Sequence, residues 1–375
     1  MKIQAAVLEE IGRPTPYARS NPLRIETLEL DAPQSGEVLV RMVAAGLCHS
    51  DLSVINGDRP RPLPMALGHE AAGIVEAVGA DVTDLTPGDP VVCVFVPSCG
   101  HCAPCAEGRP ALCEPGAAAN GAGTLLSGGV RLSGPDGRVL HHLGISCFAD
   151  HAVVSRRSIV KIDKDIPLHI AALMGCAVLT GTGAVFNTGA VPPASKVAVV
   201  GLGGVGLAAV LGAEAAGAET IVAIDMLDDK LELALKLGAT HAFNAADPDL
   251  TEKVKDVTKG GVDSALEFAG SAKALAGAYR ITRRGGTTIT GGLPNPQAVL
   301  ELPAVSLVAE ERTLRGSYLG SGVPSRDIPR FLGLYRRGKL PVDKLLTHRL
   351  TLDEINIGFD RLHEGEAIRQ VVEFS

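Results

Sequence analysis

The sequence predicts an α/β protein of two domains, a largely β domain followed by a doubly wound parallel sheet. A chain of 375 residues with 46% hydrophobic residues is long enough to build two cores. Up to about residue 160, short strand-like runs alternate with Gly and Pro turns. From about residue 196 the rhythm becomes strand, glycine turn and long helix, repeated, which is typical of a parallel sheet covered by helices.

The first domain is predicted from its apolar runs. The N-terminal MKIQAAVLEE indicates an opening strand, and it lacks the apolar core of an export signal, so we expect a cytoplasmic protein. Further strands are expected at 37–43 and 90–95. Residues 166–195 carry no formal charge, but Gly and Pro interrupt them, which favours a buried helix at the domain junction over a membrane span.

The second domain is predicted from strands that alternate with helical segments. Such alternation specifies parallel strands joined by crossover helices. Six strands are expected, at 196–200, 220–225, 241–244, 262–268, 286–291 and 312–319. We expect a cleft between the two domains to hold the chemistry.

Composition excludes several classes of partner. The net charge is −7, from 35 basic and 42 acidic residues, with no basic block to attract DNA or an anionic membrane. There is no Trp and only 3% of residues are aromatic, which argues against stacking on single-stranded nucleic acid. We therefore expect small-molecule partners, with no nucleic acid and no membrane.

Four cysteines form the most informative local pattern. They are spaced by three, three and eight residues, close enough to converge on one ion. Four thiolates are the ligand set of closed structural zinc sites. Disulfides are disfavoured because they suit secreted chains, and an iron–sulfur cluster is disfavoured by a second set of zinc-type ligands elsewhere. The four residues are Cys99, Cys102, Cys105 and Cys113.

A glycine-rich turn predicts a dinucleotide site. It follows the apolar strand 197–200 and precedes a helix-forming run, where backbone amides at a helix N-terminus can receive a pyrophosphate. Asp225 ends the next strand and can accept hydrogen bonds from the adenosine ribose, although an isolated Asp there could also be a solvated strand end. Because a carboxylate repels a 2′-phosphate, NAD is favoured over NADP. The turn is Gly201-Leu202-Gly203-Gly204-Val205-Gly206.

Two further runs resemble the zinc-dependent medium-chain alcohol dehydrogenase family. They are Cys48-His49-Ser50-Asp51 and Gly68-His69-Glu70-x2-Gly73-x5-Gly79-x2-Val82, and the terminal Ala367-Ile368-Arg369 also matches. The resemblance covers nearly the whole chain. It implies a GroES-like catalytic domain at 1–178, completed by 320–375, and a Rossmann domain at 179–319.

The same resemblance implies a second, catalytic zinc ion. Its ligands would be Cys48, His69 and Cys176, with Glu70 beside them as an occasional direct ligand or an indirect one. Taken singly, a Cys is usually a small buried apolar residue, and a His is usually a core or surface group with its polar atoms satisfied. The cofactor contacts implied by the family lie at His49, Thr180, Lys230 and Arg369. We therefore expect NAD and two zinc ions per chain.

The resemblance also assigns a proton route. Ser50 would take the alcohol proton, unless it is a helix N-cap, and Asp51 would orient His69. Two positions depart from many family members: Ser53 replaces a relay His, and His49 replaces an Arg. Proton exit therefore stays open, and His49 could contact a phosphate or simply be exposed.

Substrate and assembly are only weakly encoded. By resemblance, Phe95, Phe148 and Leu293 would line an apolar pocket, although each could equally be core. The Ala- and Gly-rich segment 114–139 corresponds to a loop kept in dimeric family members, so a homodimer is expected, with a tetramer as alternative. Residues 114–129 contain no Arg or Lys, which disfavours the branch that acts on thiol adducts of formaldehyde.

The function expected from these features is NAD-dependent, zinc-catalysed interconversion of alcohols with aldehydes or ketones. The nearest alternative is a dehydrogenase of a formaldehyde thiol adduct or of a polyol. An alternative of another class is a non-catalytic, zinc-stabilised dinucleotide-binding protein. The second ligand set disfavours it, because a structural role would need only the four-cysteine lobe.

Overall fold

The computed structural model describes residues 1–374, which form two compact units. The first unit holds residues 1–176 and 323–332 together with the C-terminal segment from 346, and the second holds 177–322 and 333–345. Residues 333–345, expected in the first domain, therefore belong to the second. The reason is local packing, because the 3-10 turn Val342–Leu345 contacts helix α7 (Gly204–Ala216).

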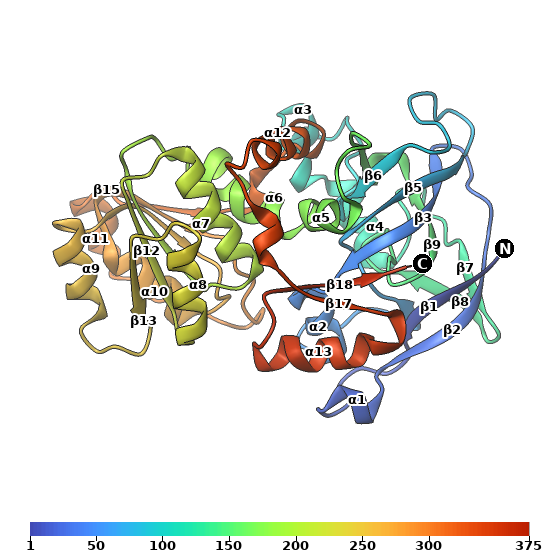
Figure 1. Ribbon diagram of the computed structural model, residues 1–375, viewed down its shortest axis with the longest axis horizontal. Helices are drawn as coiled ribbons and strands as arrows, with labels where there is room; N and C mark the ends of the chain where they lie inside the picture. The colour runs from blue at the N-terminus through green and yellow to red at the C-terminus, as the bar shows by residue number, and fades with distance from the viewer. Residues whose placement is uncertain (375) are drawn as a thin grey trace. The chain divides into compact units, whose positions relative to one another are not determined.

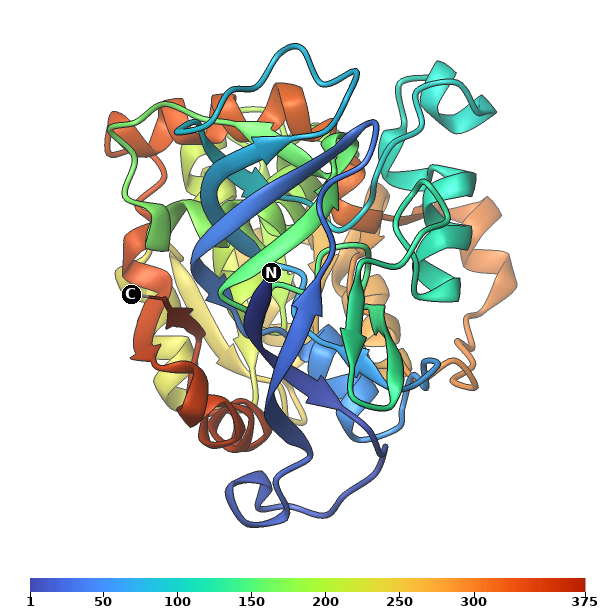
Figure 2. The same cartoon turned by 90° about the vertical axis from the view of Figure 1, so that its right-hand side faces the viewer.

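The first unit is built from a small closed barrel and a larger sheet, as the β-rich pattern predicts. Figure 2 shows strand β2 between β1 and the antiparallel hairpin β7–β8 of the barrel. The barrel order is β1 (Lys2–Leu8), β2 (Leu23–Leu30), β7 (Leu132–Gly134), β8 (Gly137–His141) and β4 (Met65–Ala66). The seven-stranded sheet has the order β10 (Ile159–Lys161), β6 (Pro90–Cys93), β5 (Ala71–Val78), β3 (Glu37–Gly46), β18 (Arg369–Glu373) and β17 (Leu346–Leu350), with β9 (His151–Ser155) also paired to β3.

Strand β3 is the centre of the first unit. Its residues alternate along most of its length, so that Val38, Val40 and Met42 are fully buried in the core while Arg41 is half-buried. The C-terminal strand β18 pairs antiparallel with the end of β3, as expected from its return to this domain. This pairing brings Arg369, at the start of β18, into the interior of the first unit.

The segment 114–139 is ordered by a helix, a hairpin and a buried ion pair. Its Ala-rich part forms α4 (Glu114–Ala122), and β7 and β8 follow. Arg131 donates from Nε and Nη2 to the two carboxylate oxygens of Glu37, each at 2.8 Å. Burial alone would raise the pKa of Glu37, but hydrogen bonds from Arg131, the Gln34 backbone and Ser127 lower it. The pair ties this segment to β3.

The helices of the first unit lie between its strands along the chain. They are α1 (Tyr17–Ser20), α2 (His49–Ile55), α3 (Ala103–Ala106), α4, α5 (Leu168–Ala171) and α13 (Ile355–Glu364), and α12 (Pro324–Arg336) begins in this unit.

The second unit contains one six-stranded, entirely parallel sheet, which confirms the doubly wound prediction. Four of the expected strands begin where predicted, but β15 begins at residue 282, four residues earlier than expected. Strand β16 ends at Gly316, before the expected residue 319, because the chain turns at Leu319 and Gly320, which adopt positive φ angles of 49° and 64°. The sheet order is β13 (His241–Asn244), β12 (Thr220–Asp225), β11 (Lys196–Val200), β14 (Val262–Glu267), β15 (Thr282–Thr290) and β16 (Thr313–Gly316).

Helices cover both faces of this sheet (Figure 1). Side chains from α9 (Leu250–Thr258) and α10 (Ala272–Ile281) pack in one cluster with Val200 of β11. Val199 precedes Val200 in β11, so its side chain points to the other face of the sheet. Gly206 of α7 lies against Val199 and so covers that face. The remaining helices of the unit are α6 (Ala177–Gly183), α8 (Asp228–Lys236) and α11 (Ala304–Ala309).

Among residues 1–374, no single helix is long and apolar enough to cross a membrane. Two consecutive helical segments that are bent relative to each other, Leu168–Gly175 and Ala177–Thr188, are long and apolar enough for a membrane span only when they are taken together. These helices occupy the uncharged stretch in which a buried helix was expected, and the side chains of α6 are all buried.

Candidate metal centres and dinucleotide loop

The four predicted cysteines come together in the first unit. Their Sγ atoms all lie within 4.8 Å of one another, on the turns around α3 and before α4. Backbone amides point at the sulfurs: Cys99 N lies 3.2 Å from Cys113 Sγ, and Cys102 N lies 3.3 Å from Cys99 Sγ. Gly100 supports this geometry with a φ of +86°. Four convergent sulfurs, of which those of Cys99 and Cys113 accept amide hydrogen bonds, fit a closed zinc site.

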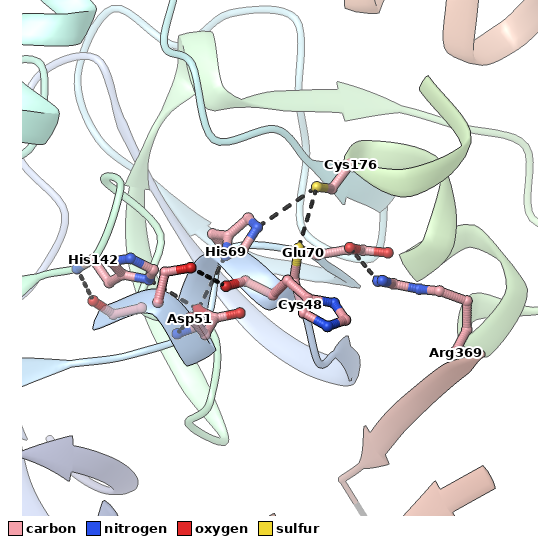
Figure 3. Close-up of polar contacts among 11 residues, drawn as sticks. Cys48, Asp51, His69, Glu70, His142, Cys176 and Arg369 are labelled. Atoms are coloured by element: carbon pink, nitrogen blue, oxygen red, sulfur yellow. Dashed lines mark hydrogen bonds and ion pairs between the residues drawn. The ribbon is translucent and has the colours of Figure 1, made fainter. Parts of the chain in front are cut away.

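A second cluster lies in the interior of the first unit. Cys48 precedes the first turn of α2, and its Sγ lies 4.0 Å from the Sγ of Cys176. His69, in the turn between β4 and β5, places its Nε2 3.6 Å from the same Cys176 sulfur (Figure 3). One donor atom from each of these residues and from Glu70 lies within 4.8 Å of the others, and all four residues are buried. Two sulfurs and one imidazole nitrogen fit a zinc ion.

Glu70 and Arg369 form a fully buried ion pair beside this cluster. Burial raises the pKa of Glu70 to about 7, although the positive charge of Arg369 opposes the shift. Arg369, expected from the resemblance at a cofactor pyrophosphate, lies here against a carboxylate of the metal cluster, and its cofactor contact stays a prediction. The pair supplies charge balance where burial would otherwise disfavour a carboxylate.

Asp51 makes the contact expected with the imidazole of His69. Its Oδ1 lies 3.0 Å from Nδ1 of His69, which leaves Nε2 of His69 to face the sulfurs. The same Oδ1 accepts a hydrogen bond from the backbone of Gly68 at 3.2 Å. Nδ1 of His142 also lies 3.0 Å from this oxygen. Burial alone would raise the pKa of Asp51, but His69 and His142 hold it well below its usual range.

His142 is a member of the site that the sequence analysis missed. Its side chain is 2% exposed and its ring stands edge-on to that of His69, with 5.5 Å between centroids. Burial lowers the pKa of His142, although Asp51 opposes this shift. The only signal in the sequence was the adjacent pair His141-His142, which carries no metal-ligand spacing by itself.

The glycine turn of the second unit has the geometry of a dinucleotide loop. Gly201 has a φ of +89°, and a Cβ on Gly206 would lie 1.8 Å from the Gly201 carbonyl oxygen, so both positions require glycine. A Cβ on Gly203 would meet nothing within 4 Å, which leaves open space at the N-cap of α7. Gly204 and Val205 form the first turn of that helix. This arrangement fits a pyrophosphate at the helix N-terminus.

Asp225 ends β12 next to this loop. One of its carboxylate oxygens accepts a hydrogen bond from the backbone of Leu202 at 2.7 Å, and the other accepts one from Leu227 at 3.1 Å. The carboxylate therefore orders the glycine loop, and its contact with a cofactor ribose stays a prediction. This ordering of the loop was not anticipated from the sequence.

Other predicted residues are placed as follows. Ser50 lies half-buried in the first turn of α2, whose N-cap is Cys48, so Ser50 is not the N-cap. Ser53 donates its hydroxyl hydrogen to the carbonyl oxygen of His49 at 2.8 Å, and His49 itself is exposed. In the second unit, Thr180 is buried within α6 and Lys230 is half-buried on α8.

The three predicted pocket residues differ in environment. Phe95 lies edge-on to His69, with 5.4 Å between ring centroids, and so borders the metal cluster. Phe148 is fully buried in the main core and packs against Phe359 of α13, and its place in the substrate pocket stays a prediction. Leu293, in the second unit, is 53% exposed.

The two remaining cysteines are fully buried, as expected. Burial raises the pKa of Cys93 to about 12 and that of Cys147 well above its ordinary value. Both are therefore unreactive thiols near neutral pH.

Comparison with known proteins agrees with both halves of this description. A family model described as an alcohol dehydrogenase GroES-like domain matches residues 34–164, and one described as a zinc-binding dehydrogenase matches residues 204–337. The chain is 41% identical to an NDMA-dependent alcohol dehydrogenase of Amycolatopsis methanolica, over 99% of each chain. It is 40% identical to a geraniol dehydrogenase of Castellaniella defragrans, over 99% of this chain and 97% of the relative.

A solved structure has the same fold along the full length. The benzyl alcohol dehydrogenase of Acinetobacter calcoaceticus superimposes with a TM-score of 0.93 at 35% identity, covering 100% of both chains. Together with the two metal clusters and the dinucleotide loop, these matches show that the chain is an alcohol dehydrogenase of the zinc-dependent medium-chain family.

Proposed function

We propose that this alcohol dehydrogenase interconverts alcohols with aldehydes or ketones, using NAD as hydride acceptor and zinc at the Cys48, His69 and Cys176 cluster. The observation that carries the proposal is that cluster itself. Two sulfurs and an imidazole converge in the interior, beyond the four cysteines that a structural zinc needs. A non-catalytic protein would have no use for this second set of ligands.

The residues around the cluster support a division of tasks. A zinc ion bound there would polarise the oxygen of the alcohol or carbonyl substrate. Asp51 orients His69, and Glu70 with Arg369 balances charge. Phe95 provides an apolar wall.

Ser50 is the first group we assign to the substrate proton, because it lies in the helical turn that follows Cys48. A serine hydroxyl is not a base near neutral pH and can only pass the proton on. Ser53 cannot act as the imidazole base found at its position in many relatives, and its own hydroxyl hydrogen is directed to the backbone of His49. We infer that the proton leaves Ser50 to water or to the cofactor ribose.

The substrate class we propose is primary alcohols with an aromatic ring or a double bond next to the carbinol carbon. Geraniol and benzyl alcohol, which give two of the relatives their names, share that feature. The apolar face of Phe95 beside His69 suits such a substrate.

The decisive assay measures alcohol oxidation with each acceptor. Benzyl alcohol, geraniol, ethanol, a polyol and the glutathione adduct of formaldehyde are compared by NADH absorbance, with NDMA as a second acceptor. We expect the highest kcat/KM for benzyl alcohol or geraniol with NAD. Oxidation only when NDMA is added would overturn NAD dependence. The chain would then require NDMA, as the name of its Amycolatopsis relative states for that enzyme. Preference for the adduct or the polyol would favour the alternative substrate classes.

Asp225 is expected to make NAD preferred over NADP. Replacing it with Ser should reduce the preference, measured as the ratio of the two kcat/KM values, by at least about tenfold, because two charges 4 Å apart repel by about 1 kcal/mol in water and more in a protein. Asp225→Asn is the matched variant, since its amide oxygen can still accept the hydrogen bond from Leu202. If only the Ser variant changes the ratio, loop order and not charge explains it. A wild-type preference for NADP would contradict the assignment.

A homodimer and a cytoplasmic location complete the proposal. Strand β16 is an edge of the parallel sheet with all four residues exposed, and Val305, Val308 and Leu314 are exposed nearby in the chain. Exposed edges and apolar side chains of this kind favour self-association, and light scattering should give twice the mass of one chain. The eight free cysteines suit a reducing compartment.

A further inference from the structure

His142 contributes the least expected polar group of the metal centre. Its Nδ1 and that of His69 lie at the same distance, 3.0 Å, from one oxygen of Asp51. The Asp51 carboxylate is therefore held between two imidazoles, one that faces the metal-binding sulfurs and one that does not (Figure 3). Among residues 1–374, the other oxygen, Oδ2, has no hydrogen-bond partner, and Nδ1 of His142 meets Oδ1 at contact distance without the geometry of a hydrogen bond.

The backbone at His142 is fixed by hydrogen bonds within a tight turn. Ile145 and Ser146 donate their amide hydrogens to the carbonyl oxygen of His142, and the hydroxyl of Ser146 accepts from the His142 amide at 2.9 Å. Leu143 and Ser146 have φ angles of 51° and 54°. Such left-handed conformations are unfavourable for non-glycine residues and cluster at functional sites.

Removing the second imidazole would change how Asp51 is held. The carboxylate would keep its hydrogen bonds with His69 and the amide of Gly68, both from one short turn, and would lose the 3.0 Å contact with the His142 imidazole. With one side released, the carboxylate could rotate about its Cβ–Cγ bond, and the His69 ring would lose part of its fixed orientation.

We propose that His142 is a positioning residue of the catalytic metal centre, which acts through Asp51 to orient His69. This proposal rests on the proposed zinc site at Cys48, His69 and Cys176, but not on NAD or on any substrate. The alternative is a buried histidine that serves only packing.

Zinc release separates these possibilities without an activity assay. The protein with both zinc ions bound is mixed with a chelating zinc indicator, and the two phases of release are followed. The phase missing in Cys48→Ser belongs to the catalytic site. The His142→Phe variant keeps an aromatic ring but has no hydrogen-bond donor. In this variant that phase should become about tenfold faster, which is the low end of the change seen when a residue that contacts a metal ligand is replaced. The phase of the four-cysteine site should not change.

Two variants control the experiment. His142→Asn places an amide donor near the position of Nδ1 and should restore much of the slow release. His141→Phe makes the same change at the adjacent, equally buried position, where Nε2 accepts from the Arg131 amide at 3.0 Å and not from Asp51. It should lower the melting temperature but leave the catalytic phase unchanged.

Several outcomes would overturn the proposal. Wild-type release from His142→Phe would show that the imidazole is not needed. If His142→Phe and His141→Phe accelerated zinc release equally, or if His142→Asn did not restore slow release, the effect would be a general loss of stability. A wild-type protein that binds only one zinc would reject the catalytic zinc site together with this inference, whereas inactivity with NAD would leave the release result standing.

Discussion

Replacing Cys48 with Ser is expected to abolish turnover and to lower the zinc content from the proposed two ions per chain to one, while the chain stays folded. Even groups that only support a metal ligand change affinity or activity by about 10–100-fold, so loss of a ligand should lower kcat/KM by more than about a hundredfold. The fold should persist, since the surrounding core is held by β3, β5 and β18. Zinc per chain, kcat/KM and the melting temperature of the same sample test this expectation.

Cys93→Ala is the matched control for that variant. Cys93 is equally buried but faces no metal cluster, so its removal should leave two zinc ions and nearly wild-type turnover. An active Cys48→Ser enzyme, or one that still binds two zinc ions, would contradict the assigned role.

Replacing Cys102 with Ser should strongly lower the stability of the protein, whereas the molecules that remain folded should keep most of their activity. The site is closed by four thiolates, and binding of structural zinc supplies about 10–16 kcal/mol of folding free energy in small zinc domains. Even a loss of about 3 kcal/mol would lower the melting temperature by several degrees. We expect one zinc per chain, a lower melting temperature and faster proteolysis of the lobe at 99–113.

His101→Ala is the control in the same lobe. His101 is exposed between two ligands, but its imidazole does not belong to the cysteine cluster. It should keep both zinc ions and the wild-type melting temperature. A Cys102→Ser protein that loses activity without losing stability would show that the two zinc sites have been assigned in the wrong order.

Local features of the chain were predicted well. The four cysteines lie within fifteen residues, so short turns alone bring their sulfurs together. The glycine loop and β11 are likewise adjacent in sequence, and the apolar runs of the parallel strands mark their positions closely. The ends of β15 and β16 were less accurate, because positive φ at Leu319 and an irregular register beside Val262 are not visible in composition.

The catalytic cluster is a different case. Cys48 and Cys176 are 128 residues apart, and only the family resemblance grouped them before the fold was known. The same limit explains Phe148, whose apolar ring suits a pocket and a core equally well. Its contact with Phe359 of α13, a distant segment of the chain, is visible only in the folded protein.

By itself, the sequence determined the fold class, the cluster of four cysteines and the glycine loop before α7, because each depends on neighbours within one turn, one strand or one repeat of the alternation. Only the tertiary structure decided what surrounds the second metal cluster. The meeting of Asp51 with His142, of Glu70 with Arg369 and of Glu37 with Arg131 depends on which strands pair. A buried charge is costly unless a partner faces it, and that partner is chosen by the packing of distant segments, not by spacing along the chain.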